Sequence, residues 1–421
     1  MTPAPLVADW LLTNISRLTT LDTDAPGASG DLGVVERAAL AARGGRVVWV
    51  GPEAALASVV DVDVIPSERR VDAGGRAVIP GFVDAHTHFL FAGDRAEEFH
   101  LRHAGVSYEE LARQGRGILS TVRATRAASA EELRSLARAR LRSFAAHGAT
   151  TVESKTGYGL DMATEARLLD VMEGLAGEPG LPRIVATFLG AHTLPPERRG
   201  SAAGRAAYVD EICERMLPAF AGRARFCDVF CESTAFTVEE SRRILSRARE
   251  LGYALKLHAD QLGPSGGAAL AAELGATSAD HLDYASDAEL GALAAAGVVG
   301  VLLPGCSFTL SIPYPPARRL YDHGLRVALA TDFNPGTSYS ESMQMMIALA
   351  VSAMGMTLAE ALTAATLGGA HALSMANEVG NLAPGKFCDI AILTGPDERA
   401  LAYHFGVNLV AETWIGAQRA G

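Results

Sequence analysis

The sequence predicts an α/β fold in two parts: a (β/α)8 TIM-like barrel, and a small β-sandwich domain formed by the N- and C-terminal segments. Three observations lead to this prediction. The middle of the chain alternates eight short apolar runs with amphipathic stretches, which is typical of a parallel barrel. Both ends show the pattern of short strands and turns instead. A barrel takes about 250 residues, so a chain of 421 residues leaves room for a second domain.

The two ends of the chain carry hairpin signals. The apolar run 47–50 lies between Gly44-Gly45 and Gly51-Pro52, and residues 389–393 and 412–415 repeat this pattern near the C-terminus. Because two β-rich ends flank an α/β middle, we expect the ends to come together as one small β-domain. The expected limits are residues 1–76 and 380–421 for the composite β-domain and residues 77–379 for the barrel.

The barrel elements follow from apolar runs and helical periodicity. The expected strands are 77–84, 150–154, 184–189, 227–231, 254–258, 278–281, 298–303 and 327–331. The expected helices include 130–147, 161–176, 237–250 and 286–296. The first crossover, about 85–148, is long enough for an extra helix and an active-site loop.

Composition excludes several classes of protein. Hydrophobic residues make up 49% of the chain, so a large core can form and disorder is not expected. A net charge of −11 disfavours nucleic acid or an anionic membrane as a partner. No apolar stretch approaches the roughly 20 residues that a membrane helix needs. The N-terminus lacks a basic, then apolar, leader pattern, and five cysteines are too few for a disulfide framework. We therefore expect a cytoplasmic protein, with Cys227 and Cys231 buried on one face of a strand.

Metal-competent side chains stand at the C-terminal ends of the predicted strands, where barrel enzymes place their chemistry. His86 and His88 alternate by two, so both imidazoles point the same way on an extended segment and Thr87 points away. His258 and Asp332, at the ends of the fifth and eighth strands, would complete three nitrogens and one carboxylate. This set suits Zn²⁺ or Fe²⁺ and leaves room for a water molecule.

A group of motifs carries a family resemblance. They are Pro80-Gly-Phe-Val-Asp-Ala-His-Thr-His88, Glu153-Ser-Lys-Thr-Gly-Tyr-Gly159, Gly190-Ala-His-Thr193, His258-Ala-Asp-Gln261, Ser278-Ala-Asp-His281 and Thr331-Asp-Phe-Asn-Pro-Gly-Thr337. The first is similar to the first-strand motif of the amidohydrolase superfamily. In this order and spacing, the set resembles the imidazolonepropionase family within that superfamily, from about residue 45 to about residue 415.

The resemblance implies roles for individual residues. The implied ligands of one Zn²⁺ or Fe²⁺/Fe³⁺ ion per subunit are His86, His88, His258 and Asp332. The implied substrate-binding positions are Arg95, Tyr158, His192, Gln261, Asn334, Gly336 and Thr337. The resemblance also implies a barrel with a flanking β-domain and a homodimer.

The implied reaction opens the lactam ring of 4-imidazolone-5-propanoate by hydrolysis to N-formimidoyl-L-glutamate, in histidine degradation. We expect metal-activated water to attack the lactam carbonyl, with His281 and the metal stabilising the oxyanion. Asp332 would pass the proton of the water to the leaving nitrogen. The resemblance places Gln261 among the catalytic residues as well, but some family members have Glu at this position. A neutral amide cannot be the general base, so that role falls on another group. Arg95 would bind the propionate through two parallel N–H···O hydrogen bonds.

Several of these residues have plainer alternative roles. Plainer alternatives are a surface position for Arg95, turn packing for Tyr158, loop packing for His192 and an ordinary turn at 334–336. Arg116 stands where many relatives have Gly, which leaves its role and that of its loop undefined. Lys155, near the end of the second strand, invites a bimetallic reading through a carboxylated lysine, but the match favours one metal. Sequence does not separate zinc from iron.

The sequence disfavours three competing functions. A deaminase of the same superfamily typically has Glu three residues after the strand-five histidine, where this chain has Gln261. A hydantoin- or dihydropyrimidine-type cyclic amidase usually has a bridging Lys on strand four, and the end of that strand, 229–232, offers none. A catalytically silent scaffold would have lost metal ligands, whereas all four are present.

Overall fold

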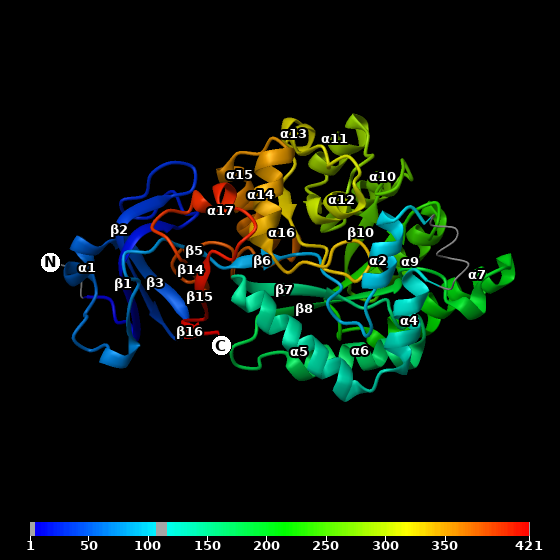
Figure 1. Cartoon of the computed structure of the whole chain (residues 1–421), viewed down its shortest axis with the longest axis horizontal. Helices are drawn as coiled ribbons and strands as arrows, with labels where there is room; N and C mark the ends of the chain where they lie inside the picture. The colour runs from blue at the N-terminus through cyan, green and yellow to red at the C-terminus, as the bar shows by residue number, and fades with distance from the viewer. Residues whose placement is uncertain (1–4, 107–115, 421) are drawn as a thin grey trace.

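Figure 1 shows two bodies side by side, a barrel surrounded by helices and a smaller β-domain that contains both chain ends. The computed structural model describes residues 5–106 and 116–420. Within those ranges, none of the helices combines the length and the apolar character needed to cross a membrane. The predicted fold class is confirmed.

The barrel is a parallel sheet of eight strands in chain order, from β6 at one edge to β13 at the other. The strands are β6 (Phe82–Asp84), β7 (Ala149–Lys155), β8 (Arg183–Ala191), β9 (Phe226–Cys231), β10 (Ala254–Ala259), β11 (Ser278–His281), β12 (Val299–Leu302) and β13 (Val327–Leu329). The two edges meet beyond the strand ends, where Thr87 and Phe333 form a parallel bridge. The His88 N–H donates to the Phe333 carbonyl at 2.9 Å there. The segments that carry His88 and Asp332 therefore become neighbours.

Helices lie between and after these strands, and most of them surround the sheet (Figure 1). They are α2 (Ala96–His103), α4 (Ile118–Ala127), α5 (Ala130–Ala146), α6 (Met162–Leu175), α7 (Ala202–Glu211), α8 (Leu217–Phe220), α9 (Val238–Glu250), α10 (Gly267–Leu274), α11 (Asp287–Ala295), α12 (Pro304–Leu310), α13 (Ala317–Asp322), α14 (Met343–Ala353), α15 (Leu358–Thr363), α16 (Gly369–Ala372) and α17 (Ala400–Tyr403). Capping boxes fix the first turns of α5, α9, α11 and α15, because a Ser or Thr before each helix pairs with a Glu three residues later. The four helices predicted at 130–147, 161–176, 237–250 and 286–296 are α5, α6, α9 and α11.

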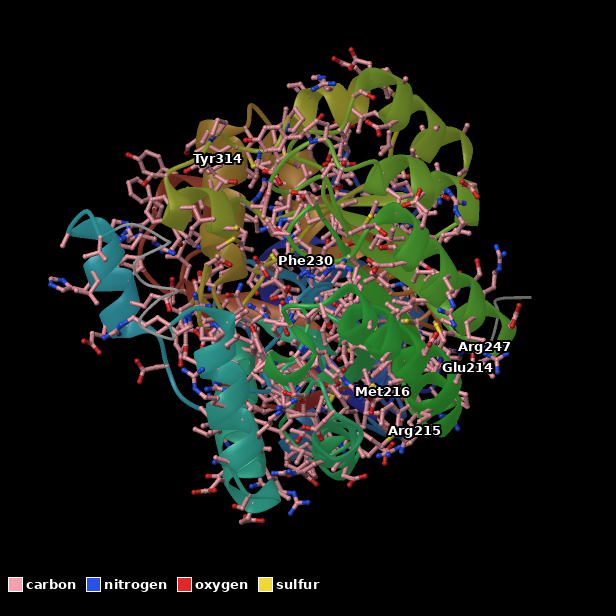
Figure 2. All side chains as sticks on the ribbon, turned by 90° about the vertical axis from the view of Figure 1, so that its right-hand side faces the viewer. Glu214, Arg215, Met216, Phe230, Arg247 and Tyr314 are labelled. Carbon is pink, nitrogen blue, oxygen red and sulfur yellow. The ribbon has the colours of Figure 1, made fainter. Side chains whose placement is uncertain are left out.

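Irregular turns connect some of these helices. The 3₁₀ turn η3 (Pro196–Arg198) precedes α7, and the π-helical turns η4 (Ile212–Met216) and η5 (Ala364–Gly368) follow α7 and α15. Within η4, Met216 is buried whereas Glu214 and Arg215 are exposed (Figure 2). The wider turn thus keeps the apolar side chain against the barrel and leaves the charged pair outside.

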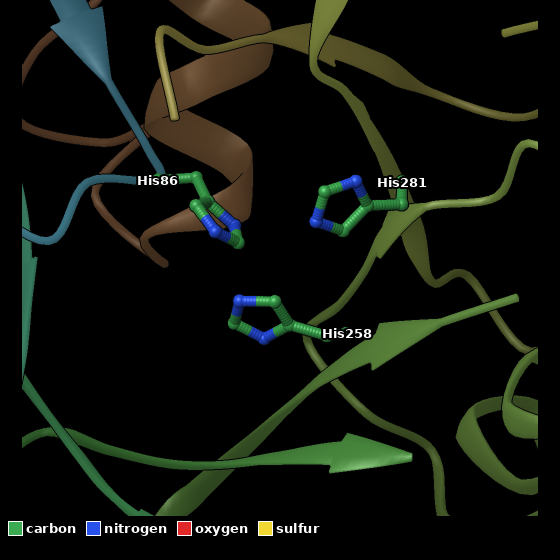
Figure 3. A group of neighbouring side chains, drawn as sticks. All are labelled: His86, His258 and His281. Atoms are coloured by element: carbon green, nitrogen blue, oxygen red, sulfur yellow. The ribbon is translucent and has the colours of Figure 1, made fainter. Parts of the chain in front are cut away.

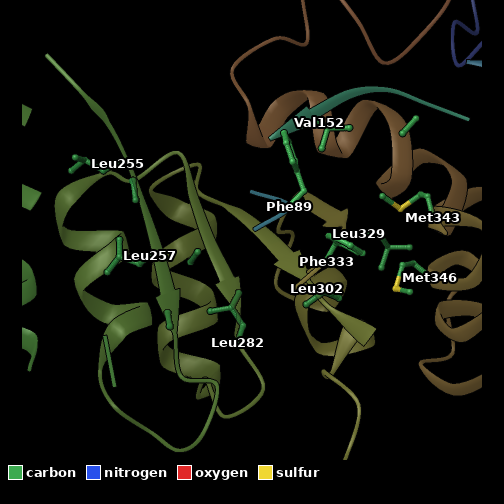
Figure 4. Close-up of a cluster of buried hydrophobic side chains, with 14 of the residues drawn as sticks. Phe89, Val152, Leu255, Leu257, Leu282, Leu302, Leu329, Phe333, Met343 and Met346 are labelled. Atoms are coloured by element: carbon green, nitrogen blue, oxygen red, sulfur yellow. The ribbon is translucent and has the colours of Figure 1, made fainter. Parts of the chain in front are cut away.

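Strand β10 shows how the barrel separates its two faces. Leu255 and Leu257 point outward into the main apolar core, among the residues drawn in Figure 4. Lys256 and His258 alternate with them and point inward, as the two-residue period of a strand requires. Met343 and Met346, also in Figure 4, are buried in the same core.

The β-domain joins both ends of the chain in one hydrogen-bonded sheet. Its strands are β1 (Trp10–Thr19), β2 (Val34–Arg43), β3 (Arg46–Pro52), β4 (Arg70–Asp72), β5 (Val78–Pro80), β14 (Ile390–Leu393), β15 (Val410–Ile415) and β16 (Gln418–Arg419). The path runs β16-β15-β14-β5-β1-β2-β3, with β4 paired to β1. Short helical turns η1 (Glu53–Ala55), α1 (Leu56–Val59) and η2 (Ser67–Arg69) complete it. Both predicted hairpin regions are confirmed, and the shared apolar core contains residues from both ends of the chain.

The first predicted barrel strand, 77–84, is two strands instead of one. Strand β5 pairs with β14 in the terminal sheet, whereas β6 pairs with β7 in the barrel. Gly81 stands between them, and a Cβ atom there would collide with the Thr150 side chain. This close approach turns the chain from one sheet to the other, which a continuous apolar run does not reveal. The domain limits given above stay a prediction.

Candidate functional site

The two histidines of the first strand face the same space. Their Nε2 atoms are 3.3 Å apart, and both residues are buried. Thr87 points the other way, since its hydroxyl donates to the Glu153 carbonyl at 2.5 Å. The orientation expected from the alternation of side chains is therefore confirmed.

His258 and Asp332 approach the same point from β10 and from the loop after β13. The Nε2 atom of His258 is 3.4 Å from that of His88. Asp332 Oδ1 is 3.6 Å from His86 Nε2 and 3.8 Å from His88 Nε2. Two nitrogen ligands at about 2.0–2.1 Å from a tetrahedral ion lie roughly 3.4 Å from each other. The separations and donor atoms thus fit one small metal ion, and the structure brings the four predicted ligands together.

His281 belongs to the same group of side chains. Figure 3 shows its ring beside those of His86 and His258, and one nitrogen of each ring lies within 4.8 Å of the others. On β11, Asp280 faces inward, so the next residue would ordinarily face outward. His281 and Leu282 instead have φ angles of 80° and 63°, which turn the ring back toward the site. Strained backbone of this kind is concentrated at functional sites.

A carboxylate stands behind two of the imidazoles. Asp280 Oδ2 is 2.6 Å from His86 Nδ1, and Asp228 Oδ2 is 3.0 Å from His258 Nδ1. The Asp280 carboxylate accepts the Nδ1–H of His86, so the lone pair of Nε2 in that ring points at the metal position. Asp228 lies at ion-pair distance from His258 Nδ1 without a hydrogen bond between them. Such partners fix the tautomer of a histidine ligand and raise its basicity.

Below these carboxylates lies a fully buried ion cluster built around Lys155. Its Nζ atom is 2.7 Å from Asp228, 2.9 Å from Glu153 and 3.6 Å from Asp280. Burial opposes the charge on Lys155, but these carboxylates outweigh it and hold the pKa of the lysine above its ordinary value. Lys256 adds a second cation, 3.7 Å from Glu153. The position of Lys155 makes it a counter-charge for the carboxylates behind the histidines.

Burial sets the protonation of the inner groups. It lowers the pKa of His86, His88 and His281 well below the usual range, and neighbouring cations add to the effect. These rings are therefore neutral at pH 7, as metal ligands must be. Burial also raises the pKa of Asp332 to about 7, so this carboxyl group can carry a proton near neutral pH in the metal-free protein.

Two predicted substrate-contact residues pack against the histidine group. The His192 ring stacks on His88 with centroids 5.1 Å apart, and Tyr158 lies 5.3 Å from His192. His192 Nδ1 is 3.1 Å from the Gly157 carbonyl. Because burial lowers the pKa of His192 to about 3, its ring is neutral, donates through Nδ1 and leaves Nε2 as an acceptor. A Cβ atom at Gly157 would lie 2.6 Å from the Leu189 carbonyl, so this turn requires glycine.

Arg95 is the residue directly before α2. Its Nε donates to Glu98 Oε2 at 2.9 Å, and its Nη2 donates to Glu98 Oε1. A Cβ atom at Gly336 would collide with Arg95 Nη1. The bidentate fork is therefore occupied by Glu98, and Nη1 is the part of the guanidinium that faces the loop after β13.

The loop after Asp332 is held by its own side chains. Asn334 Oδ1 accepts the N–H groups of Gly336 and Thr337, both at 2.8 Å. Asn334 Nδ2 donates to the Asp332 carbonyl at 2.6 Å and to the Thr337 hydroxyl at 2.9 Å. In this structure the polar groups of Asn334 shape the loop that positions Asp332.

Gln261 lies beside Cys306, with its Nε2 atom 3.6 Å from the sulfur. Its backbone N–H donates to the buried carboxylate of Glu232 at 2.7 Å. Arg116, the other departure from the family pattern, pairs with Glu97 at 2.9 Å near the end of the range 107–115 that is not described.

Sequence reasoning missed the carboxylates that support the site. Asp228 alternates with Cys227 and Val229, so it faces inward on a strand whose outer face is apolar. Asp280 lies in the motif Ser278-Ala-Asp-His281, but the sequence predicted no role for it. Asp283, whose Oδ2 is 3.8 Å from His281 Nδ1, was not singled out. A charged residue at an inward-facing position of a buried barrel strand is the signal that could have found the first two.

A model of the amidohydrolase family matches residues 77–419. The chain belongs to the amidohydrolase family. As a member, it is a hydrolase that acts on carbon–nitrogen bonds, and its histidine–aspartate group can hold a metal ion.

Relatives of this amidohydrolase carry a more specific name. It is 52% identical to the imidazolonepropionase of Symbiobacterium thermophilum, over 91% of this chain and 89% of that one. It is 46% identical to the imidazolonepropionase of Herpetosiphon aurantiacus, over 96% of this chain and 95% of that one. An adenosine deaminase from Xanthomonas campestris with bound zinc has a similar structure, with a TM-score of 0.70, 19% identity and coverage of 99% and 93%. The last likeness concerns the fold alone.

Proposed function

We propose that this amidohydrolase is an imidazolonepropionase, which hydrolyses the lactam C–N bond of 4-imidazolone-5-propanoate to N-formimidoyl-L-glutamate in histidine degradation. The observation that carries the proposal is the similarity to imidazolonepropionases, 52% identity over 91% of the chain. The arrangement of the site gives independent support. The substrate has a polar ring and an acidic side chain, and the site combines metal-binding, neutral polar and cationic side chains that can bind them.

His86, His88, His258 and Asp332 are proposed to hold one metal ion. When bound, a divalent ion there lowers the pKa of a water ligand toward about 7 and polarises a carbonyl oxygen. Asp332 takes the proton of the attacking water as the new C–O bond forms, and returns it to the ring nitrogen as the C–N bond breaks. His281 presents a ring N–H to the carbonyl oxygen, where negative charge develops. The Gln261 side chain is a neutral polar group near the site and does not act as a base.

The substrate ring is proposed to lie beside His192 and Tyr158. The free Nε2 atom of His192 can accept an N–H of the imidazolone, and the Tyr158 hydroxyl can donate to it. Arg95 Nη1 would contact the propionate, while the ordered loop that contains Asn334, Gly336 and Thr337 forms the opposite wall. These groups fix the lactam carbonyl against the metal position.

The proposal is tested by the absorbance decay of freshly generated imidazolone propanoate on addition of metal-loaded enzyme. We expect rapid decay with one equivalent of formimidoylglutamate formed. A hydantoin and dihydrouracil serve as control substrates and should remain intact, because neither presents a propionate to Arg95. A metal-loaded enzyme that leaves imidazolone propanoate unchanged would refute the assigned substrate.

The metal is proposed to be zinc or iron. Three imidazoles and a carboxylate suit both ions, so elemental analysis of protein purified without chelators decides between them.

Metal loading should depend on pH through Asp332. Its carboxyl has a pKa of about 7 in the metal-free protein, so below pH 7 an incoming ion must displace a proton. We expect the apparent affinity for Zn²⁺ to fall about tenfold for each pH unit below 7 and to level off above about 8. Competition titrations with a chelator at pH 6, 7 and 8 measure this. An Asp332→Asn variant should bind more weakly and lose that component of the pH dependence.

A homodimer in the cytoplasm is also proposed. Tyr403, Phe405 and Val407 expose 87%, 68% and 48% of their surface in one short segment, which offers an apolar contact. All five cysteines are free and buried, as suits a reducing compartment. Sedimentation analysis tests the dimer, and cell fractionation tests the location.

A further inference from the structure

A second guanidinium lies close to Arg95 above the barrel mouth. Helix α2 begins directly after Arg95 and carries Arg102 in its last turn. Arg102 Nη1 is 3.5 Å from the Gly336 carbonyl, the residue that Arg95 Nη1 also approaches. The two guanidinium groups thus meet at one point of the loop that leads from Asp332.

The charge of Arg95 is already balanced. Glu98 accepts two N–H groups from its guanidinium and takes the Gly117 N–H at 2.8 Å as well. The Glu98 side chain is buried, so this pair is well shielded from water. A carboxylate approaching Arg95 alone would meet a neutral pair whose anion repels it.

Arg102 differs in having no carboxylate of its own in the part of the chain that the structure describes. Its Nη2 atom is buried and makes no hydrogen bond there. A buried donor without a partner is unfavourable, because its interaction with water is lost and nothing replaces it. Burial and the nearby Arg95 also lower the pKa of Arg102, although Glu98 opposes this.

The charges of the cluster formed by Arg95, Glu98 and Arg102 do not cancel. Arg95, Glu98 and Arg102 carry two positive charges and one negative charge, which leaves one positive charge and one unused buried donor. One carboxylate would balance the charge and accept from Arg102 Nη2. Guanidinium–carboxylate hydrogen bonds are among the strong ones in proteins.

We infer that Arg102 is a specificity-determining residue that binds the carboxylate of the substrate, together with Nη1 of Arg95. The inference rests on the proposed function for the identity of the substrate. The substrate carboxylate completes a cluster of two guanidinium groups and two carboxylates, the second of which is that of Glu98. The site therefore selects cyclic amides that bear a short acidic side chain over neutral ones.

The test compares Arg102→Met with the intact enzyme. We expect KM for imidazolone propanoate to rise about 10- to 100-fold, with kcat changed less than about threefold. Arg102→Lys should show a smaller rise, because the charge remains and the fork is lost. Arg134→Met is the matched control, since it removes the same charge from an exposed pair with Glu131 on α5.

A binding experiment separates this role from a structural one. Imidazole-4-propanoate and its primary amide serve as probes, and calorimetry measures both affinities. The intact enzyme should prefer the carboxylate, and Arg102→Met should lose about tenfold or more of that preference. An equal loss for both probes, an unchanged preference, or no preference in the intact enzyme would each overturn the inference. Arg102→Gln replaces the Met variant if that protein does not fold.

The two proposals fail separately. An intact enzyme that prefers the carboxylate probe, loses the preference on substitution and yet leaves imidazolone propanoate unchanged would refute only the proposed reaction. Turnover of imidazolone propanoate with an unaltered Arg102→Met variant would refute only the role of Arg102.

Discussion

Replacing His258 with alanine should remove the metal and nearly all activity. His258 Nε2 lies 3.4 Å from His88 Nε2, so its loss leaves two nitrogens and one carboxylate to hold the ion. It also leaves Asp228 without its imidazole partner, 3.0 Å away in the intact protein. A metal ion contributes several kcal/mol to charge stabilisation in a transition state, and we therefore expect kcat/KM to fall by at least about 10³-fold.

Two measurements check this result on the same preparation. Elemental analysis should find one metal ion per chain in the intact protein and well below one in His258→Ala, and the steady-state rate should fall in parallel. The control is His323→Ala, because His323 lies outside the site and contacts Asp287 at 3.2 Å. That variant should keep both metal and activity. Full metal content together with full activity in His258→Ala would mean that the site has been assigned wrongly.

Replacing Lys155 with methionine should have the largest effect on stability. The side chain is fully buried among Asp228, Glu153 and Asp280, at 2.7, 2.9 and 3.6 Å. Methionine fills most of the same space without the charge. Lys256 then remains near two of the carboxylates, 3.7 Å from Glu153 and 4.0 Å from Asp280, and Asp228 has no other lysine or arginine at ion-pair distance among the described residues. Removing one partner of a buried ion pair costs about 3–5 kcal/mol of folding free energy.

Chemical denaturation monitored by circular dichroism measures that loss. Lys386→Met is the matched control, because this lysine is half-buried and has no ion pair within the described residues. We also expect the metal affinity of Lys155→Met to fall about 10- to 100-fold, since Asp228 and Asp280 orient His258 and His86. If the free energy of unfolding of Lys155→Met equals that of Lys386→Met, the buried cluster does not stabilise the fold.

Part of the site followed from local rules. The two-residue spacing of His86 and His88 fixes their common direction on any extended segment, and the structure confirms it. Strand ends meet at one rim of a parallel barrel, so the approach of His258 and Asp332 also followed once the fold class was predicted. The same local rules gave the limits of α5, α6, α9 and α11 to within two residues, because caps and apolar periodicity lie inside each segment.

Other features needed the folded chain. A strand rule places His281 on the outside of β11, yet a φ angle of 80° turns it inward. The 77–84 run divides between two sheets because Gly81 passes against Thr150. Arg95 matched a substrate-binding position by motif, but its fork is held by Glu98.

The sequence by itself predicted the barrel and the β-domain, because periodicity and turn signals lie within short segments. Motifs that resemble those of a known family indicated the family and the candidate metal ligands. Only the tertiary structure decided which charges face each other. Lys155, Asp228 and Asp280 come from three different strands, and Arg102 is assigned a role only because Glu98 already neutralises Arg95. Partners far apart in sequence leave no local pattern, and the balance of buried charge is a property of the whole cluster.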